Sequence, residues 1–253
     1  MLASATASLL DDAHRSRRCL EASAVDIADL QTAYEIQADL TSLRRSRGAH
    51  RIGWKLGYTS QVMRDQLGVH EPNHGPLLSD MVVADGGRLP ATVNHPRVEP
   101  EVALVLAATP QPGSTVRDIL DCCSSARAAL EVVDSVWCRY EFDLAHNTAD
   151  GSSAAHVVLG PEVPLDSVDR VLVTLLLDGV VQGSGVGADA AGHPALAVSW
   201  LVDALAARGE SLVPGDVVLT GGLTAAVPIE TGCTVSAVFT DASGAQTQIA
   251  VGR

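Results

Sequence analysis

The spacing of apolar residues divides the chain into a helical beginning and a strand-rich remainder. In the first 48 residues, apolar side chains recur every three or four positions: Ile27, Leu30, Ala33, Ile36 and Leu40. This is the period of an amphipathic helix, and the arginine-rich turn before Gly48 is typical of a helix end. The pattern therefore predicts helices up to Gly48.

After Arg51 the apolar runs become short, as they do in strands. RIGWKLG is followed by a short predicted helix near Gln61–Leu67 and by the turn-rich EPNHGP. The segment Arg97–Leu106, RVEPEVALVL, alternates and then becomes wholly apolar, which predicts a buried strand. Asp178-Gly179 between two apolar runs predicts a hairpin. ALEVVDS, DVVLTGG and CTVSAVF predict further strands.

Two later segments have a helical pattern. The first is Thr115–Leu130, with Ser114 as its expected N-cap, and the second is Pro194–Arg208, which ends before Gly209. The predicted fold class is therefore α+β. We expect an N-terminal helical and mixed region at residues 1–80 and a strand-rich domain at residues 81–253.

Composition excludes several classes of protein. Of 253 residues, 47% are apolar and 3% aromatic, so the core must consist of Ala, Val, Leu and Ile. The formal charge of −13 argues against nucleic acid as a partner. No apolar run approaches the about 20 residues of a membrane helix, and the N-terminus lacks the pattern of a secretory signal. Five cysteines without C-x-x-C spacing predict reduced thiols and a cytoplasmic location.

Lys55 is the only lysine of the chain, and all other basic side chains except histidine are arginine. A lysine where arginine is otherwise used indicates a site that arginine cannot occupy. The ammonium group is compact, and burial or a nearby cation can lower its pKa until it exchanges protons near pH 7. The alternative is an accident of arginine-biased coding.

Three glutamates stand in strand-like segments where solvated charges are not expected. Glu99 and Glu101 are two positions apart, so both project from one face of the strand. Glu131 lies between apolar residues in ALEVVDS. If the fold joins them, each pair at about 4 Å repels by about 4 kcal/mol at an effective dielectric near 20. A divalent cation would relieve this repulsion, and oxygen ligands favour Mg²⁺ or Mn²⁺ over zinc.

Other interpretations of the same residues remain open. An E-x-E pair can be a solvent-facing stripe, and Pro100 between the two glutamates predicts an edge strand or a bulge. Arg97 shares the strand face of Glu99 and can pair with a ligand carboxylate or with a substrate carboxylate. Four histidines are candidates for acid–base chemistry by residue type: His74, His95, His146 and His193.

Several motifs together resemble the fumarylacetoacetate hydrolase superfamily. They are HPRVEPEVALVL (His95 to Leu106), ALEVVDS with Glu131, and GWKLGYTS with Lys55. The chain resembles in particular the branch of 2-keto-4-pentenoate hydratases and 4-oxalocrotonate decarboxylases from catechol meta-cleavage pathways. The resemblance runs in order from about Tyr34 to Phe239. It implies a fumarylacetoacetate-hydrolase-like main domain, a mixed β-roll, behind the helical N-terminal part.

The resemblance also implies roles for individual residues. Glu99, Glu101 and Glu131 would be the ligands of Mg²⁺ or Mn²⁺. Lys55 and Asp80 would be catalytic residues beside the substrate. The motifs further indicate four substrate-binding residues besides Arg97: Ser153, Thr220, Gly221 and Gly222.

The implied activity is that of a lyase acting on a small 2-oxo acid. AGHPALAV and TGGLTAAVP resemble the decarboxylases, which favours loss of CO₂ from a 2-oxo-enedioic acid, such as 4-oxalocrotonate, through a metal-bound dienolate. The alternative is a hydratase of 2-hydroxypenta-2,4-dienoate, because the same dienolate can be protonated and hydrated. The family pattern Ala-Asp-Asn-x-Ser-Ser is altered here by Gly151 and Ala154, which leaves the exact substrate open.

Two further readings are weaker. A carbon–carbon hydrolase of the same superfamily usually has an aspartate as its third ligand, whereas this chain has Glu131. A non-catalytic subunit that supports a hydratase is disfavoured because the ligands and Lys55 are all present. We expect a homo-oligomer, which can associate with a cognate hydratase or decarboxylase subunit.

Overall fold

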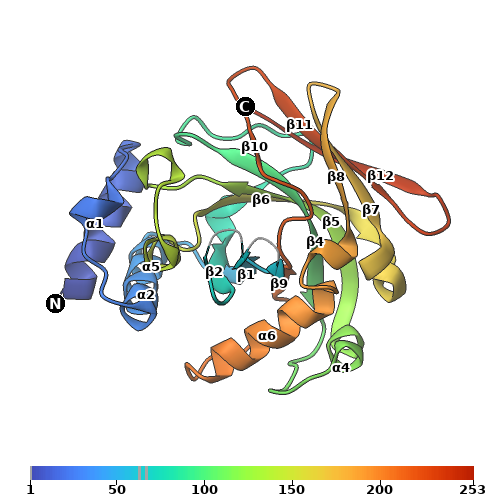
Figure 1. Ribbon diagram of the computed structural model, residues 1–253, viewed down its shortest axis with the longest axis horizontal. Coiled ribbons are helices and arrows are strands. Elements are labelled where there is room, and N and C mark those ends of the chain that lie inside the picture. The colour runs from blue at the N-terminus through green and yellow to red at the C-terminus, as the bar shows by residue number, and fades with distance from the viewer. Residues whose placement is uncertain (1, 62–63, 66–67) are drawn as a thin grey trace.

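The computed structural model describes residues 2–61, 64–65 and 68–253. Two long helices form one side of the molecule: α1 (Leu2–Ser16) and α2 (Leu30–Ser46), with a short 3-10 turn η1 (Ala22–Ala24) between them (Figure 1). The Asp29 side chain caps α2 by accepting a hydrogen bond from the Thr32 amide. The helical beginning predicted from the apolar period is confirmed. The short helix predicted near Gln61–Leu67 falls partly outside the described residues.

A large mixed sheet forms the body of the protein. Its strand order is β2-β1-β9-β4-β5-β6-β3, and β10 pairs with β4 off this path. The bounds are β1 Arg51–Gly57, β2 Asn73–Leu78, β3 Val82–Val83, β4 Arg97–Leu106, β5 Cys123–Val133, β6 Ala154–Val163, β9 Val217–Leu219 and β10 Val227–Pro228. This sheet takes strands from both sides of residue 80. The predicted division into a region 1–80 and a domain 81–253 stays a prediction.

A second, antiparallel sheet has the order β12-β11-β7-β8. Its strands are β7 Leu172–Leu177, β8 Val180–Val186, β11 Thr234–Thr240 and β12 Gln246–Gly252. Asp178 and Gly179 join β7 to β8 with positive φ angles of 49° and 80°. These are the angles of a two-residue hairpin turn, so the predicted hairpin is confirmed.

Shorter helices in the described part of the chain after residue 68 are α4 Val116–Asp121, α5 Leu144–Ala149 and α6 Pro194–Ala206. The 3-10 turns are η2 Ser79–Met81, η3 Cys138–Tyr140, η4 Leu165–Arg170 and η5 Gly187–Asp189. The prediction for α6 was correct to within two residues. The prediction of a helix through Leu130 was wrong after Asp121, because Cys123–Val133 pairs with strands on both sides. Thr115, not Ser114, caps α4.

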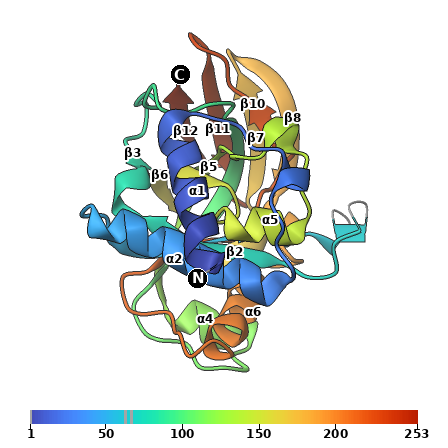
Figure 2. The ribbon, with the colours of Figure 1, turned by 90° about the vertical axis from the view of Figure 1, so that its left-hand side faces the viewer.

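Buried apolar clusters position the parts of the molecule. The main core joins the sheets to α6 through residues such as Val102, Leu130 and Leu201, all buried. A second cluster joins α1 and α2 to the segment around Trp137 and α5, and includes Leu10. Figure 2 shows α1 and α2 side by side across this face. Among the described residues, no helix combines the length and apolar character needed to cross a membrane.

Pro100 causes no bulge in β4. It lies opposite Leu130 in a continuous β4–β5 pairing, and the register shifts only between Val105 and Leu106. The Pro100 carbonyl accepts a hydrogen bond from Leu223, away from β5. Since the nitrogen and carbonyl of one residue point to the same side of an antiparallel strand, the missing N–H removes no β4–β5 bond. On that other side, β10 and β9 leave residues 99–102 without a strand partner.

Candidate metal and substrate site

The antiparallel pairing of β4 and β5 brings the three predicted glutamates together. Glu99 lies directly opposite Glu131, and Glu101 follows two residues later on the same face. One carboxylate oxygen from each of the three residues lies within 4.8 Å of the other two. Glu101 and Glu131 are buried. Like charges directly opposite in a sheet are destabilising, so the arrangement requires a compensating cation.

Lys55 from β1 supplies one positive charge to this cluster. Its Nζ lies 3.1 Å from Oε2 of Glu131. The same ammonium donates hydrogen bonds to the carbonyl oxygen of Ser152 (3.1 Å) and to its hydroxyl oxygen (3.2 Å). The Lys55 side chain is buried. Strand β1 thus places the only lysine of the chain beside the three carboxylates, away from water.

Burial and repulsion between carboxylates raise the pKa values of Glu99 and Glu101. Burial, and then the charge of Glu131, raises the pKa of Glu99 to about 7. The same two causes raise the pKa of Glu101. Burial alone would lower the pKa of Lys55, but the carboxylates outweigh it and the net shift is upward. In the metal-free protein the carboxylates therefore favour the ammonium form of Lys55, and the pKa shift is opposite to the lowering that burial or a nearby cation can cause.

The donor set fits a hard divalent cation. Oε1 of Glu101 and Oε1 of Glu131 are buried and have no hydrogen-bond partner within the described part of the chain. Buried carboxylate oxygens without partners are costly, and one ammonium cannot balance three carboxylates. Ligands that are all oxygen, without thiolate or imidazole, suit Mg²⁺, Mn²⁺ or Ca²⁺.

The turn after β9 packs its backbone against the carboxylates. The Gly221 amide donates to Oε2 of Glu101 (2.7 Å), and Gly221 has a φ of 112°, which favours glycine. A β-carbon at Gly222 would collide with Oε2 of Glu99. Thr220 is oriented differently, because its hydroxyl is buried and donates to the carbonyl of Val102. Thr220 thus supports the turn, whereas the two glycines border the carboxylates.

A cavity of about 700 Å³ opens in front of Glu99 and Lys55. Arg97 lies on its wall, with the guanidinium 4.1 Å from the centre of the Tyr140 ring. Ser153 also lines the cavity. Apolar side chains cover other parts of the wall: Leu30, Val69, Val133, Phe142 and Leu144. The cavity therefore offers two cations and a mostly apolar passage to a small acid.

Asp80 lies apart from this group. It belongs to η2, is exposed, and pairs with Arg44 at 3.0 Å. It is not among the residues that line the cavity. Asp80 lies in a sequence motif that resembles the family, but the short η2 turn directs its carboxylate towards Arg44 of α2. The expectation that it lies beside the substrate does not agree with this position.

The four histidines considered for acid–base chemistry also make their contacts away from the three glutamates. His74 packs among aromatic rings, and burial lowers its pKa to about 3. His193 caps α6 by accepting from the Ala195 amide, and His146 contacts Asp143. His95 contacts Cys19. None of the four lines the described cavity.

Some site residues were not anticipated. Ser152, which holds Lys55, stands beside the predicted Ser153 in the same motif. Asn73 accepts a hydrogen bond from Ser152 and follows the turn-rich Glu71–Pro72. Tyr140, Asp143 and Asn147 belong to a segment without an obvious chemical motif. Only Ser152 could have been found from the sequence, since its motif was already recognised.

The fold and this cluster define a family of enzymes built around a carboxylate-lined site. The family model for the fumarylacetoacetate hydrolase C-terminal domain matches residues 69–249. The chain belongs to the fumarylacetoacetate hydrolase family, as its motifs predicted.

Its relatives carry two activities. A 2-keto-4-pentenoate hydratase of Burkholderia vietnamiensis is 37% identical over 214 residues, which cover 83% of this chain and 82% of that protein. A 4-oxalocrotonate decarboxylase of Pseudomonas sp. strain CF600 is 34% identical, with 82% and 84% covered. The solved 4-oxalocrotonate decarboxylase from Pseudomonas putida G7, complexed with magnesium and adipate, matches with a TM-score of 0.93 and 27% identity over 99% of this chain and 96% of that one. Decarboxylases and hydratases are both lyases, and this chain is a lyase.

Proposed function

We propose that the protein is a metal-dependent decarboxylase of a 2-oxo-enedioic acid of the 4-oxalocrotonate type. In this proposal Glu99, Glu101 and Glu131 hold Mg²⁺ or Mn²⁺. The observation that carries it is the inward-facing carboxylate cluster with Lys55 at 3.1 Å, at the end of a cavity that also contains Arg97. Two cations beside a metal site suit a substrate with two carboxylates.

The residues of the chain can each be given a task. A divalent cation, when bound, supplies Lewis-acid stabilisation of negative charge on the 2-oxo oxygen. Arg97 holds the distal carboxylate until the carbon–carbon bond breaks and CO₂ leaves with its oxygens. The electron pair of that bond passes into the conjugated chain. Lys55 keeps a proton at Nζ, oriented by Ser152, and delivers it to the carbon chain.

The apolar wall of the cavity supports loss of CO₂ over addition of water. Val133, Phe142 and Leu144 form an apolar part of this wall and offer no hydrogen bond to a water beside the substrate. Exclusion of water also strengthens the interaction of the substrate with Lys55 and Arg97.

A hydratase remains the second candidate, since 2-keto-4-pentenoate hydratases are among the curated relatives. The substrate of a 2-keto-4-pentenoate hydratase has one carboxylate, so Arg97 would then have no second carboxylate to bind. This difference separates the two candidates by the choice of substrate.

The decisive experiment measures CO₂ release and water addition in parallel. Purified protein is given a 2-oxo-enedioic acid or a 2-hydroxydienoic monoacid, with Mg²⁺, with Mn²⁺ or with a chelator. We expect metal-dependent CO₂ release from the diacid. Water addition to the monoacid without CO₂ release would favour the hydratase, and turnover in the presence of the chelator would remove the metal from the proposal.

Arg97→Gln sharpens this test. Because a hydrogen bond to a charged group contributes about 1.5–3 kcal/mol, the KM for the diacid should rise by roughly ten- to a hundredfold. The monoacid should be affected less. An equal effect on both substrates would show that Arg97 supports the pocket instead of binding the second carboxylate.

The expected cytoplasmic location, homo-oligomer and cognate hydratase or decarboxylase partner stay predictions.

A further inference from the structure

The turn that holds Lys55 has an unusual backbone. Gly151, Ser152 and Ser153 follow one another with φ angles of 69°, 57° and 56°. Residues with side chains rarely occupy this left-handed region, and such strain persists only where the surroundings hold it. The middle residue, Ser152, presents both of its oxygens to the Lys55 ammonium. The position of the ammonium therefore depends on whatever fixes this turn.

The buried carboxylate of Asp150 fixes the turn from behind. Its Oδ2 accepts hydrogen bonds from the Ser135 hydroxyl (3.1 Å), the Val136 amide (3.2 Å) and the Ser153 hydroxyl (3.3 Å). Asp150 is 2% exposed, so these contacts take the place of water. One carboxylate thus joins the turn to the segment that follows β5.

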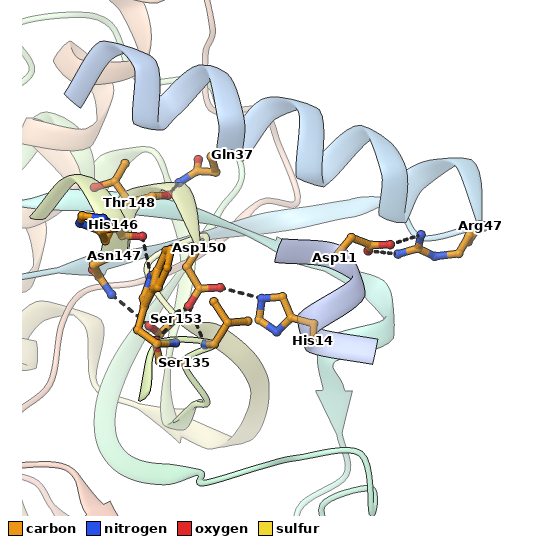
Figure 3. Close-up of polar contacts among 12 residues, drawn as sticks. Asp11, His14, Gln37, Arg47, Ser135, His146, Asn147, Thr148, Asp150 and Ser153 are labelled. Atoms are coloured by element: carbon orange, nitrogen blue, oxygen red, sulfur yellow. Dashed lines mark hydrogen bonds and ion pairs between the residues drawn. The ribbon is translucent and has the colours of Figure 1, made fainter. Parts of the chain in front are cut away.

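The other oxygen of this carboxylate is held by the N-terminal helix. Nε2 of His14, on α1, lies 2.6 Å from Oδ1 of Asp150 (Figure 3). A carboxylate oxygen can only accept, so Nε2 carries the hydrogen. No second contact to Oδ1 occurs among the described residues. Removal of His14 would leave this buried oxygen unpaired and free the carboxylate to turn.

We propose that His14 is a positioning residue for Lys55, acting through Asp150 and the Gly151–Ser153 turn. The element that carries it, α1, lies outside residues 69–249, which match the family model. The position of Lys55, which itself lies outside these residues, would therefore depend on a helix that the C-terminal family model does not match. Asn73 also holds the Ser152 hydroxyl, so loss of His14 should displace the ammonium without releasing it.

The chain offers a matched control for this inference. Asp11, also on α1, forms a two-bond ion pair with Arg47, the C-cap residue of α2 (Figure 3). This pair holds α1 against α2 but does not touch Asp150. Asp11→Asn therefore loosens the docking of α1 alone, whereas His14→Leu also removes the donor to Asp150. His14→Gln restores an amide donor at a similar position.

The presence of a single lysine provides a direct readout. With lysine labelled by ¹³C at its ε-carbon, a proton–carbon correlation spectrum contains one lysine signal, that of Lys55. We expect His14→Leu to displace this signal, His14→Gln to return it towards the wild-type position, and Asp11→Asn to leave it in place. This readout needs no turnover, so it remains valid if the proposed decarboxylase activity, on which the role of Lys55 rests, is wrong.

Kinetics provide the second readout. A misplaced catalytic group lowers kcat more than it weakens binding, so His14→Leu should lower kcat about tenfold or more with little change in KM. Asp150→Asn, which replaces an acceptor oxygen by a donor, should act in the same direction and serves if His14→Leu does not fold. An unmoved lysine signal in Asp150→Asn would overturn the inference. So would equal effects of Asp11→Asn and His14→Leu.

Discussion

Two groups of charges in this protein differ in their surroundings. Arg139 lies between Glu21 and Glu141 on the surface, at 2.9 and 3.0 Å, and all three side chains are more than half exposed. In the site, Glu101, Glu131 and Lys55 are withdrawn from water and carboxylates outnumber ammonium groups. Water screens the first group, so its ion pairs contribute little to folding. The charges of the second group repel one another and destabilise the fold of the metal-free protein. Their presence is best explained by the binding of a cation.

The largest effect is expected from removal of one carboxylate of the site. Glu131→Gln keeps the shape of the side chain but removes a ligand charge. Because a bound metal ion contributes several kcal/mol of stabilisation, turnover should fall at least about 1000-fold. Metal affinity should fall with it, as measured by titration with Mn²⁺. Full activity of Glu131→Gln in metal-free buffer would show that the cluster is not a metal site.

Lys55→Arg tests the lone cation of the cluster. Arginine keeps the charge, but it is larger and does not release its proton. If Lys55 transfers a proton to the substrate, kcat should fall at least about 100-fold. The measurement is kcat with saturating metal. A loss confined to KM would assign Lys55 to substrate binding alone.

The stability of the metal-free protein should depend on pH in a direction set by Glu99. Its folded-state pKa of about 7 lies above the ordinary value of 4.5. A raised pKa contributes stability below the ordinary value, and this contribution is lost as pH rises through the folded value. The Tm without metal should therefore decrease between pH 5 and pH 8.

Addition of Mg²⁺ or Mn²⁺ provides the matching control. Protons compete with the metal for the carboxylates, so the metal should raise the Tm more at pH 8 than at pH 5. At a concentration of 100 times the dissociation constant, binding stabilises the folded state by about 2.7 kcal/mol. A metal-induced increase that is larger at pH 5 would contradict the assignment. Glu131→Gln should lose most of the increase at both pH values.

The sequence predicted those parts of the site that depend on local periodicity. Alternation in β4 places Glu99 and Glu101 on one face whatever the partner strand is. The alignment of Glu99 with Glu131 depends on the pairing of β4 with β5, which the sequence does not specify. Most of β5, up to Leu130, has the wrong prediction of a helix, because its alanine-rich segment has no clear period of its own.

Residues that act through tertiary contacts were the hardest to predict. Asp80 has the sequence context of a site residue, but its backbone turn directs it to Arg44. His14 has no motif, since its role arises only where α1 meets Asp150. The single lysine was informative because its residue type, and not its spacing, was exceptional.

The smallest effect is expected at the surface group, where Arg139→Gln removes the cation shared by Glu21 and Glu141. Hydrogen bonds with Arg139 lower the pKa of both glutamates, so the interaction exists, but water and salt screen it. The variant should keep the Tm and the metal response of the wild type. Its Tm, measured at low and at 1 M salt, should follow that of the wild type closely. Arg139→Gln could instead lose as much stability as the metal-free protein loses at pH 8. Solvent exposure would then not explain the difference between the two groups, and the number of charges alone would decide their effect on stability.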